Sequence, residues 1–312
     1  MKATVVKHTG SHYLLSKLPE WAPFVAVTKG RLRLAGSEST NPIAVGDIVE
    51  YEEGSDKSGG EKTCTIKKIE PRKNCIVRRS TNLSRVNHVI AANIDCVFLI
   101  VTLREPETKP QFVDRFLVTC EAYGVPVVIL VNKSDIYLPG EVSDFAKTYE
   151  DIGYKVLETS VVNGLNVDEL RELCKGKVVL FSGQSGVGKS SLISALDPSL
   201  KLKTAKISEA HQQGKHTTTF YEMHPLSCGG FVVDTPGIRG FGLVDFSKEE
   251  LSNYFPEMLR IEDNCKFIPC THTHEPGCAV KAAVEEGKIS VERYLSYLAM
   301  LEDDGKYRAP EE

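Results

Sequence analysis

One eight-residue stretch, GQSGVGKS at residues 183–190, constrains the fold of this chain more than any other. It fits the pattern G-x-x-x-x-G-K-[ST] and lies between the apolar segment KVVLFSG and the segment KSSLISALD, which has helical character. Glycines let the backbone curl so that its N–H groups surround phosphate oxygens, and the following helix N-terminus adds partial positive charge. The stretch therefore predicts a strand, a phosphate-binding loop and a helix.

The residue types in this loop predict contacts with a nucleoside triphosphate and its metal ion. The Lys189 side chain can reach the outer phosphates, and the Ser190 hydroxyl can ligate Mg²⁺. The predicted nucleotide contacts of the loop are Gly183, Gln184, Ser185, Gly186, Val187, Gly188, Lys189, Ser190 and Ser191.

Two downstream segments complete the predicted phosphate end of the site. FVVDTPG is an apolar strand ending in Asp234, whose carboxylate can hold the water shell of the metal, and the N–H of Gly237 can reach the γ-phosphate. The polar stretch GKHTTTF, residues 214–220, offers the Thr217 or Thr218 hydroxyl to Mg²⁺. A surface cluster of threonines is the alternative interpretation of that stretch.

A second motif, VNKSDI at residues 131–136, follows the apolar run YGVPVVIL and predicts recognition of guanine. Its contact residues are Asn132, Lys133, Ser134 and Asp135. The Asp135 carboxylate can accept hydrogen bonds from the ring N–H and the exocyclic amino group of guanine, a donor pair that adenine lacks. This opposes an ATPase, the other nucleotide class that a phosphate loop permits. Thr159 and Ser160 in ETSVVNG also follow a predicted strand and resemble the loop that buttresses the base.

The order of these motifs is inverted. The base-reading motif and its buttress precede the phosphate loop, whereas an ordinary GTPase begins with the phosphate loop. Each motif nevertheless falls at the end of a predicted strand, so a circular permutation explains the order. Such a cut is tolerated where the original termini lie close together at the surface, because the contacts within the sheet stay the same.

The remaining sequence predicts three domains in 312 residues. Residues 1–75 contain about five short β-rich runs, which predict an OB-fold barrel. Residues 76–243 alternate strands and helices, which predicts an α/β domain with a parallel sheet. Residues 244–312 are mainly helical. No apolar run is long enough to cross a bilayer and no secretory signal is evident, so we expect a soluble, cytoplasmic protein with no membrane partner.

A cysteine cluster near the C-terminus predicts a metal site. CKFIPCTHTHEPGC provides Cys265, Cys270 and Cys278 with His272, and three thiolates with one imidazole suit a closed, structural Zn²⁺ site. His274 is a competing ligand, and unliganded thiols are the alternative. The other six of the nine cysteines are scattered singly, which favours reduced thiols over disulfides.

Charge is unevenly distributed along a chain of net charge -4. Residues 1–80 contain 14 Lys and Arg against 9 Asp and Glu, so they are positive and the remainder is negative. Arg72, Lys73, Arg78 and Arg79 gather where the first domain meets the second. This region could approach the phosphates of RNA, although a solvated basic surface is as consistent with charge alone.

The motif order, the VNKSDI, GQSGVGKSSL, GKHTTT and DTPGIRGFG segments and the cysteine cluster together resemble the RsgA (YjeQ or CpgA) family of circularly permuted GTPases. The resemblance covers essentially the whole chain. It implies a factor for maturation of the 30S ribosomal subunit, with the subunit and its 16S rRNA as partners and with GTP hydrolysis stimulated by the subunit. It also favours His272 over His274 as the zinc ligand.

The same resemblance implies a catalytic role for His216. Ile238 follows Gly237 where Ras-like enzymes have the glutamine that positions water, and an aliphatic side chain cannot do so. The resemblance implies that the histidine of GKHTTT holds the water instead, and a neutral imidazole can accept a proton near pH 7. A solvent-exposed loop histidine is the alternative.

We expect a monomer that binds no DNA. The rival function is a zinc-containing RNA-binding module that holds guanine nucleotide only as a structural ligand.

Overall fold

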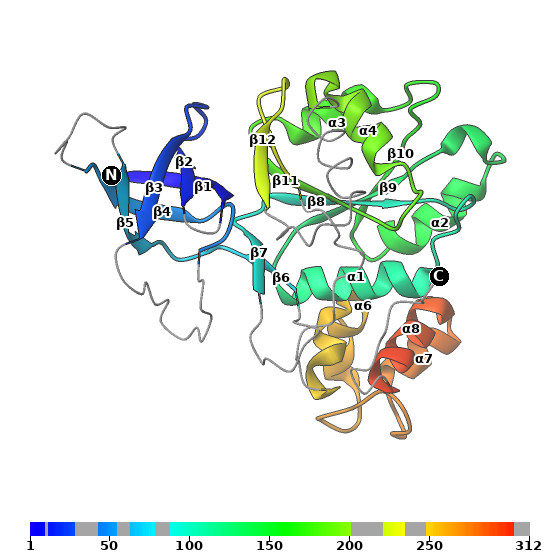
Figure 1. The fold of residues 1–312 in the computed structure, drawn as a ribbon. Coiled ribbons are helices and arrows are strands. Elements are labelled where there is room, and N and C mark those ends of the chain that lie inside the picture. Colours follow the sequence, from blue (N-terminus) through cyan, green and yellow to red (C-terminus); the bar gives the residue numbers. More distant parts are fainter. Residues whose placement is uncertain are drawn as a thin grey trace, which may run out of the picture.

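The computed structural model describes residues 1–9, 12–28, 43–54, 63–78, 88–200, 221–234 and 248–302. Figure 1 shows three parts: a β-barrel at the N-terminal end, an α/β sheet in the middle, and a group of helices packed beneath helix α1. The strands of the first two parts form one continuous hydrogen-bonded sheet, joined where β1 pairs with β12.

The N-terminal part is a closed five-stranded barrel. Neighbouring strands run in the order β1-β2-β3-β5-β4, and β1 also pairs with β4 to close the ring. All pairings are antiparallel except that between β3 and β5. A five-stranded barrel with one long crossover of this kind is an OB-fold, which confirms the predicted fold class. Its strands are β1 (Lys2–His8), β2 (Tyr13–Ser16), β3 (Phe24–Thr28), β4 (Ile48–Glu52) and β5 (Cys64–Ile69).

The middle part has a sheet of six strands in the order β10-β9-β8-β11-β13-β12, parallel except for the β12 edge. Every residue of β8 is buried, which explains its continuous apolar sequence, because helices cover both faces. The strands are β8 (Cys96–Val101), β9 (Val127–Val131), β10 (Lys155–Glu158), β11 (Val178–Ser182), β12 (Glu222–Pro225) and β13 (Phe231–Asp234).

Four helices cover the two faces of this sheet. One core cluster contains side chains of α1 (Pro110–Ala122) and α2 (Glu141–Glu150), and the other contains side chains of α3 (Val167–Cys174) and α4 (Lys189–Leu196). Each pair therefore occupies its own face, which leaves the carboxyl ends of the parallel strands uncovered by these helices. Short 3₁₀ helices lie at Ser134–Ile136 and Pro198–Leu200.

A two-stranded ribbon, β6 (Cys75–Arg78) with β7 (His88–Ala92), connects the barrel to the sheet. Ile76 and Ile90 lie in the same core cluster as α1 and α2, and this cluster also includes Val6 and Val45 of the barrel. Trp21 stacks on Phe231 at 5.8 Å between ring centroids, which adds a further contact between the two parts. The division predicted at residue 75 stays a prediction.

The C-terminal part packs against α1. Its core cluster includes Val118 of α1 together with residues of α6 (Pro256–Leu259), α7 (Ala279–Glu285) and α8 (Val291–Glu302). Two 3₁₀ helices span Lys248–Tyr254 and Glu262–Asn264. The boundary predicted at residue 243 lies outside the described residues. None of the described helices has the length and apolar composition needed to cross a membrane.

One buried guanidinium joins this helical part to helix α1 of the middle part. Arg293 on α8 is 1% exposed, and it donates to Glu257 Oε1 and Oε2 at 2.8 and 3.1 Å and to Asp114 Oδ1 at 2.8 Å. Asp114 lies on α1, and it also accepts a hydrogen bond from the Tyr149 hydroxyl at 3.2 Å. The network thus spans helices from both parts and contains two carboxylates for one cation.

We expect Arg293→Met to destabilise the protein by about 3–5 kcal/mol, because two buried carboxylates lose their shared cation. Chemical denaturation measures the loss. Adding Asp114→Asn and Glu257→Gln to the variant should recover part of the stability, because the buried charges disappear. Lys288→Met, which removes an exposed ammonium paired with Glu286, is the matched control. An Arg293→Met variant as stable as this control would contradict the prediction.

Candidate nucleotide site and metal centre

The stretch GQSGVGKS forms a tight loop between β11 and α4. Gly183 and Gly188 have φ values of 152° and 94°, which side-chain-bearing residues rarely adopt. A Cβ atom on Gly183 would lie 2.4 Å from the carbonyl oxygen of Ile100, so no other residue fits there. The predicted strand, loop and helix are therefore present, with the loop at the carboxyl end of β11.

Lys189 folds back over this loop. Its Nζ donates hydrogen bonds to the carbonyl oxygens of Gly183 and Gln184 at 2.5 and 3.2 Å. Ser190 and Ser191, in the first turn of α4, are exposed. Cation and hydroxyl groups are thus gathered around one loop, where phosphate oxygens and a divalent metal would find complementary groups.

Several predicted residues of the phosphate end have no described side chain. Asp234 ends β13, the strand beside β11, so its backbone is at the predicted edge of the sheet. Its side chain and the residues His216, Thr217, Thr218 and Gly237 lie outside the described residues. Their proposed roles stay predictions.

The base-reading motif contacts the phosphate loop directly. Asn132 is 2% exposed, and its Nδ2 donates to the carbonyl oxygen of Val187 at 2.9 Å. A Cβ atom on Gly188 would lie 2.5 Å from that Nδ2, so a glycine is needed at position 188 for this contact as well as for its own φ. Two motifs far apart in the sequence therefore lie in direct contact.

The buttress predicted after β10 holds the same motif from the other side. The Thr159 hydroxyl donates to Asn132 Oδ1 at 3.1 Å, and the Ser134 N–H donates to the Thr159 carbonyl at 3.2 Å. The Ser160 hydroxyl donates to Asp135 Oδ1. Thr159 and Ser160 are fully buried, whereas Asp135 is exposed. Asp135 is thus an oriented carboxylate with acceptor capacity left for a ligand.

Strand order explains how motifs in an inverted order meet. The base-reading motif follows β9, the phosphate loop follows β11, and only β8 separates these two parallel strands. Loops that follow parallel strands emerge at the same edge of a sheet, where α/β proteins bind ligands. The circular permutation changes which strands the chain connects, but the same loops still meet at this edge of the sheet.

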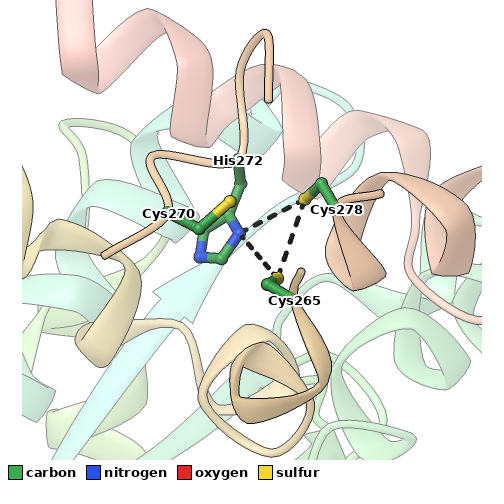
Figure 2. A group of neighbouring side chains, drawn as sticks. All are labelled: Cys265, Cys270, His272 and Cys278. Carbon is green, nitrogen blue, oxygen red and sulfur yellow. Dashed lines mark hydrogen bonds between the residues drawn. The ribbon is translucent and has the colours of Figure 1, made fainter. Parts of the chain in front are cut away.

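The helical part contains the predicted metal-ligating cluster. Ligand atoms of Cys265, Cys270, His272 and Cys278 all lie within 4.8 Å of one another (Figure 2). The Cys265 and Cys278 sulfurs are 4.0 Å apart, and His272 Nδ1 lies 3.7 and 3.4 Å from them. Tetrahedral Zn²⁺ with ordinary bond lengths separates two sulfurs by about 3.8 Å and a sulfur from a nitrogen by about 3.5 Å. The cluster therefore has the size of a zinc site.

The surroundings of the cluster suit metal-bound thiolates. The backbone N–H of Ala279 donates to Cys265 Sγ at 3.3 Å, and that of Lys281 donates to Cys278 Sγ at 3.4 Å. Burial lowers the pKa of His272, which favours the neutral imidazole that a metal requires. His274, the competing ligand in the sequence, is exposed and outside the group.

A family model described as RsgA GTPase matches residues 69–244, which is more than half of the chain. The chain belongs to the RsgA GTPase family. A curated relative from Bacteroides fragilis, named small ribosomal subunit biogenesis GTPase RsgA, is 51% identical over 314 residues and covers 99% of both chains. One of the same name from Flavobacterium psychrophilum is 49% identical over 312 residues, covering 99% of this chain and 95% of the relative.

Two solved structures have the same architecture as this RsgA-family chain. YjeQ from Thermotoga maritima superposes with a TM-score of 0.78 at 32% identity, over 98% of this chain and 99% of that one. YloQ, described as a circularly permuted GTPase, gives 0.71 at 28% identity, over 99% and 96%. The predicted resemblance and the permuted GTPase fold are confirmed, and the chain is a GTPase by family.

One of the four basic residues at the barrel junction, Arg72, is less available to bind RNA phosphates than the sequence suggested. Arg72 is bound by Asp47, a fully buried residue, through two contacts of 2.7 Å, and Lys73 pairs with Asp95. Asp47 also accepts the N–H of Ala44, so this carboxylate organises the barrel. Arg72 is thus a structural residue of the barrel in this RsgA-family chain, whereas Lys73 pairs with Asp95 at an exposed position.

Sequence reasoning missed two groups that touch the base-reading motif. The Tyr137 hydroxyl donates to the Asn132 carbonyl at 2.6 Å, and Lys133 Nζ donates to the Glu105 carbonyl. Tyr137 lies two residues after Asp135 and could have been considered for that reason. Glu105 contributes only a backbone oxygen, which no residue type signals.

Proposed function

We propose that this chain binds GTP and GDP, hydrolyses GTP, and acts in the biogenesis of the small ribosomal subunit. In this proposal the subunit raises the GTPase activity of the chain. The observation that carries the proposal is the hydrogen bond from Asn132 to the Val187 carbonyl, because it brings the base-reading motif into contact with the phosphate loop, as a shared nucleotide site requires. The names of the relatives supply the ribosomal partner.

In this proposal guanine donates hydrogen bonds to the Asp135 carboxylate, which Ser160 orients. Asn132 and Thr159 keep the VNKSDI segment in place. The phosphate loop surrounds the phosphates, and Lys189 exchanges its carbonyl partners for phosphate oxygens. Mg²⁺ would be held by Ser190 and by Thr217 or Thr218, with Asp234 on its water shell. The metal would neutralise charge that develops on the phosphates during hydrolysis.

Zn²⁺ is proposed as a structural ion held by Cys265, Cys270, His272 and Cys278. Four protein ligands leave no open position for a reacting water, so the ion would stabilise the helical part and take no part in hydrolysis.

The remaining proposals are a cytoplasmic, monomeric protein whose OB-fold barrel faces 16S rRNA, with Arg78 and Arg79 as the junction cations that approach its phosphates. The side chains of these two arginines lie outside the described part of the chain.

The test is GTP hydrolysis by the full-length protein with and without purified small ribosomal subunits. We expect slow turnover alone and a rate at least about tenfold higher with subunits, since ordering of the nucleotide site lowers the barrier. Lys189→Ala, which removes the phosphate-reaching ammonium, should abolish both rates. A hydrolysis rate that the subunits do not raise would favour an RNA-binding module that holds nucleotide only as a structural ligand.

A second variant tests how the reacting water is held. We expect His216→Ala to lower subunit-stimulated hydrolysis by on the order of 100-fold, the typical contribution of a general base, and to leave GDP affinity within about twofold. Stopped-flow release of phosphate measures the first quantity, and fluorescence titration with a labelled GDP measures the second. The neighbouring His211→Ala is the control. Stimulated hydrolysis that survives His216→Ala would show that another group positions the water.

A further inference from the structure

The loop after β8 lies between the two motifs of the nucleotide site. Strand β8 has β9 on one side and β11 on the other, so the segment Leu103–Glu107 emerges between the base-reading motif and the phosphate loop (Figure 1). None of its residues was singled out by sequence.

This segment touches both of its neighbours. The Glu105 carbonyl oxygen accepts a hydrogen bond from Lys133 Nζ in the base-reading motif. On the other side, a Cβ atom on Gly186 would lie 3.2 Å from Cδ of Pro106, so the proline ring packs closely on the phosphate loop. One short loop thus contacts a side chain that flanks the base and a backbone that flanks the phosphates.

Buried polar groups hold the loop in this conformation. Thr102 and Thr108 are almost fully buried at its two ends. The Thr102 hydroxyl donates to the Pro106 carbonyl at 2.5 Å, and the Thr108 hydroxyl accepts the Thr102 N–H at 3.1 Å. Buried hydroxyls need such partners, so another loop conformation would leave them unsatisfied.

A third link comes from Tyr137. Its hydroxyl donates to the Asn132 carbonyl at 2.6 Å and accepts the Leu103 N–H at 3.0 Å, so one oxygen joins the loop to the base-reading motif. Both partners of the contact between Glu105 and Lys133 have positive φ values, 53° and 64°. Side-chain-bearing residues adopt such conformations uncommonly, and these conformations are enriched at functional sites.

We propose that Leu103–Glu107 is a positioning element of the nucleotide site, which fixes Lys133 through the Glu105 carbonyl and the phosphate loop through Pro106. The inference rests on the proposed binding of guanine nucleotide. The element keeps a flexible lysine in one orientation before the ligand arrives, so less side-chain entropy is lost on binding. Loosening it should weaken nucleotide binding while the chemistry at the γ-phosphate proceeds as before.

The test compares Tyr137→Phe with wild type in the full-length protein. We expect GDP to dissociate about tenfold faster and KM for GTP to rise by a similar factor, with kcat within about twofold, because the change affects binding uniformly. Tyr154→Phe is the matched control: it also removes one hydroxyl, which bonds Glu121, from the opposite end of the sheet. Pro106→Ala, with the exposed Pro139→Ala as its control, tests the phosphate-loop contact in the same way.

Each outcome decides the matter. GDP dissociation that is unchanged in both Tyr137→Phe and Pro106→Ala overturns the proposal, as does an equal acceleration in Tyr154→Phe. A fall in thermal stability without a change in dissociation would assign the loop a purely structural role and would also overturn it. Failure of wild-type protein to bind GDP would instead refute the proposed function, so the two failures are distinguishable.

Discussion

Asp135→Asn should weaken GDP binding by on the order of 100-fold, because the variant loses a charged acceptor for two guanine donors, each worth about 1.5–3 kcal/mol. The same change should create binding of xanthosine diphosphate, whose base has a carbonyl where guanine has the amino group and can accept from the introduced amide. The Ser160 hydroxyl can still donate to the oxygen of that amide, so we expect the loop to keep its shape.

Calorimetric titration with GDP, xanthosine diphosphate and ADP measures this exchange of specificity. Asp151→Asn, an equivalent change at an exposed position at the end of α2, should bind all three as wild type does. If Asp135→Asn binds GDP about as tightly as wild type does, Asp135 does not read the base, and the assignment of the VNKSDI motif is wrong.

Removal of the proposed zinc is expected to have the largest effect on stability. His272→Ala should lose metal and lower the unfolding temperature by at least about 10 °C, because structural zinc in small domains supplies most of the folding free energy. The small core of the helical part contains the metal-ligating cluster of residues 265–278 and the apolar side chains around Phe255 and Tyr297. Amide exchange should therefore accelerate in α7 and α8 first.

The matched control for this prediction is His274→Ala, two residues away. His274 is exposed and outside the cluster, so the variant should keep one zinc per chain and the wild-type unfolding temperature. Metal content by atomic absorption and unfolding by differential scanning calorimetry give the two readouts. Equal zinc retention in both variants would contradict the assignment of His272 as a ligand.

The motifs were predictable because each depends on residue type and spacing within a few residues. The glycines of GQSGVGKS, the carboxylate of VNKSDI and the three cysteines with His272 are required by local backbone geometry or ligand chemistry. The apolar runs of β8, β9 and β11 predicted a buried parallel sheet, because strands covered on both faces lose the polar alternation of half-exposed ones.

The contacts between motifs were not predictable in this way. No spacing in the sequence shows that the Asn132 amide reaches the Val187 carbonyl, or that the Glu105 carbonyl reaches Lys133, because these pairs depend on which strands are neighbours in the sheet. The same reason explains why Arg72 was grouped with a basic surface by sequence proximity, while its partner Asp47 lies 25 residues away on the barrel.

By itself, the sequence determined the motifs of this protein: a phosphate-loop pattern, a carboxylate proposed to select guanine, a Cys3His cluster and the inverted order that marks a permuted GTPase. Only the tertiary structure decided how these parts act together, through the β9-β8-β11 neighbourhood, the loop from β8 and the buried Arg293 that joins α8 to α1. The physical reason is that residue chemistry is local, whereas packing and strand pairing join segments that are distant in the chain.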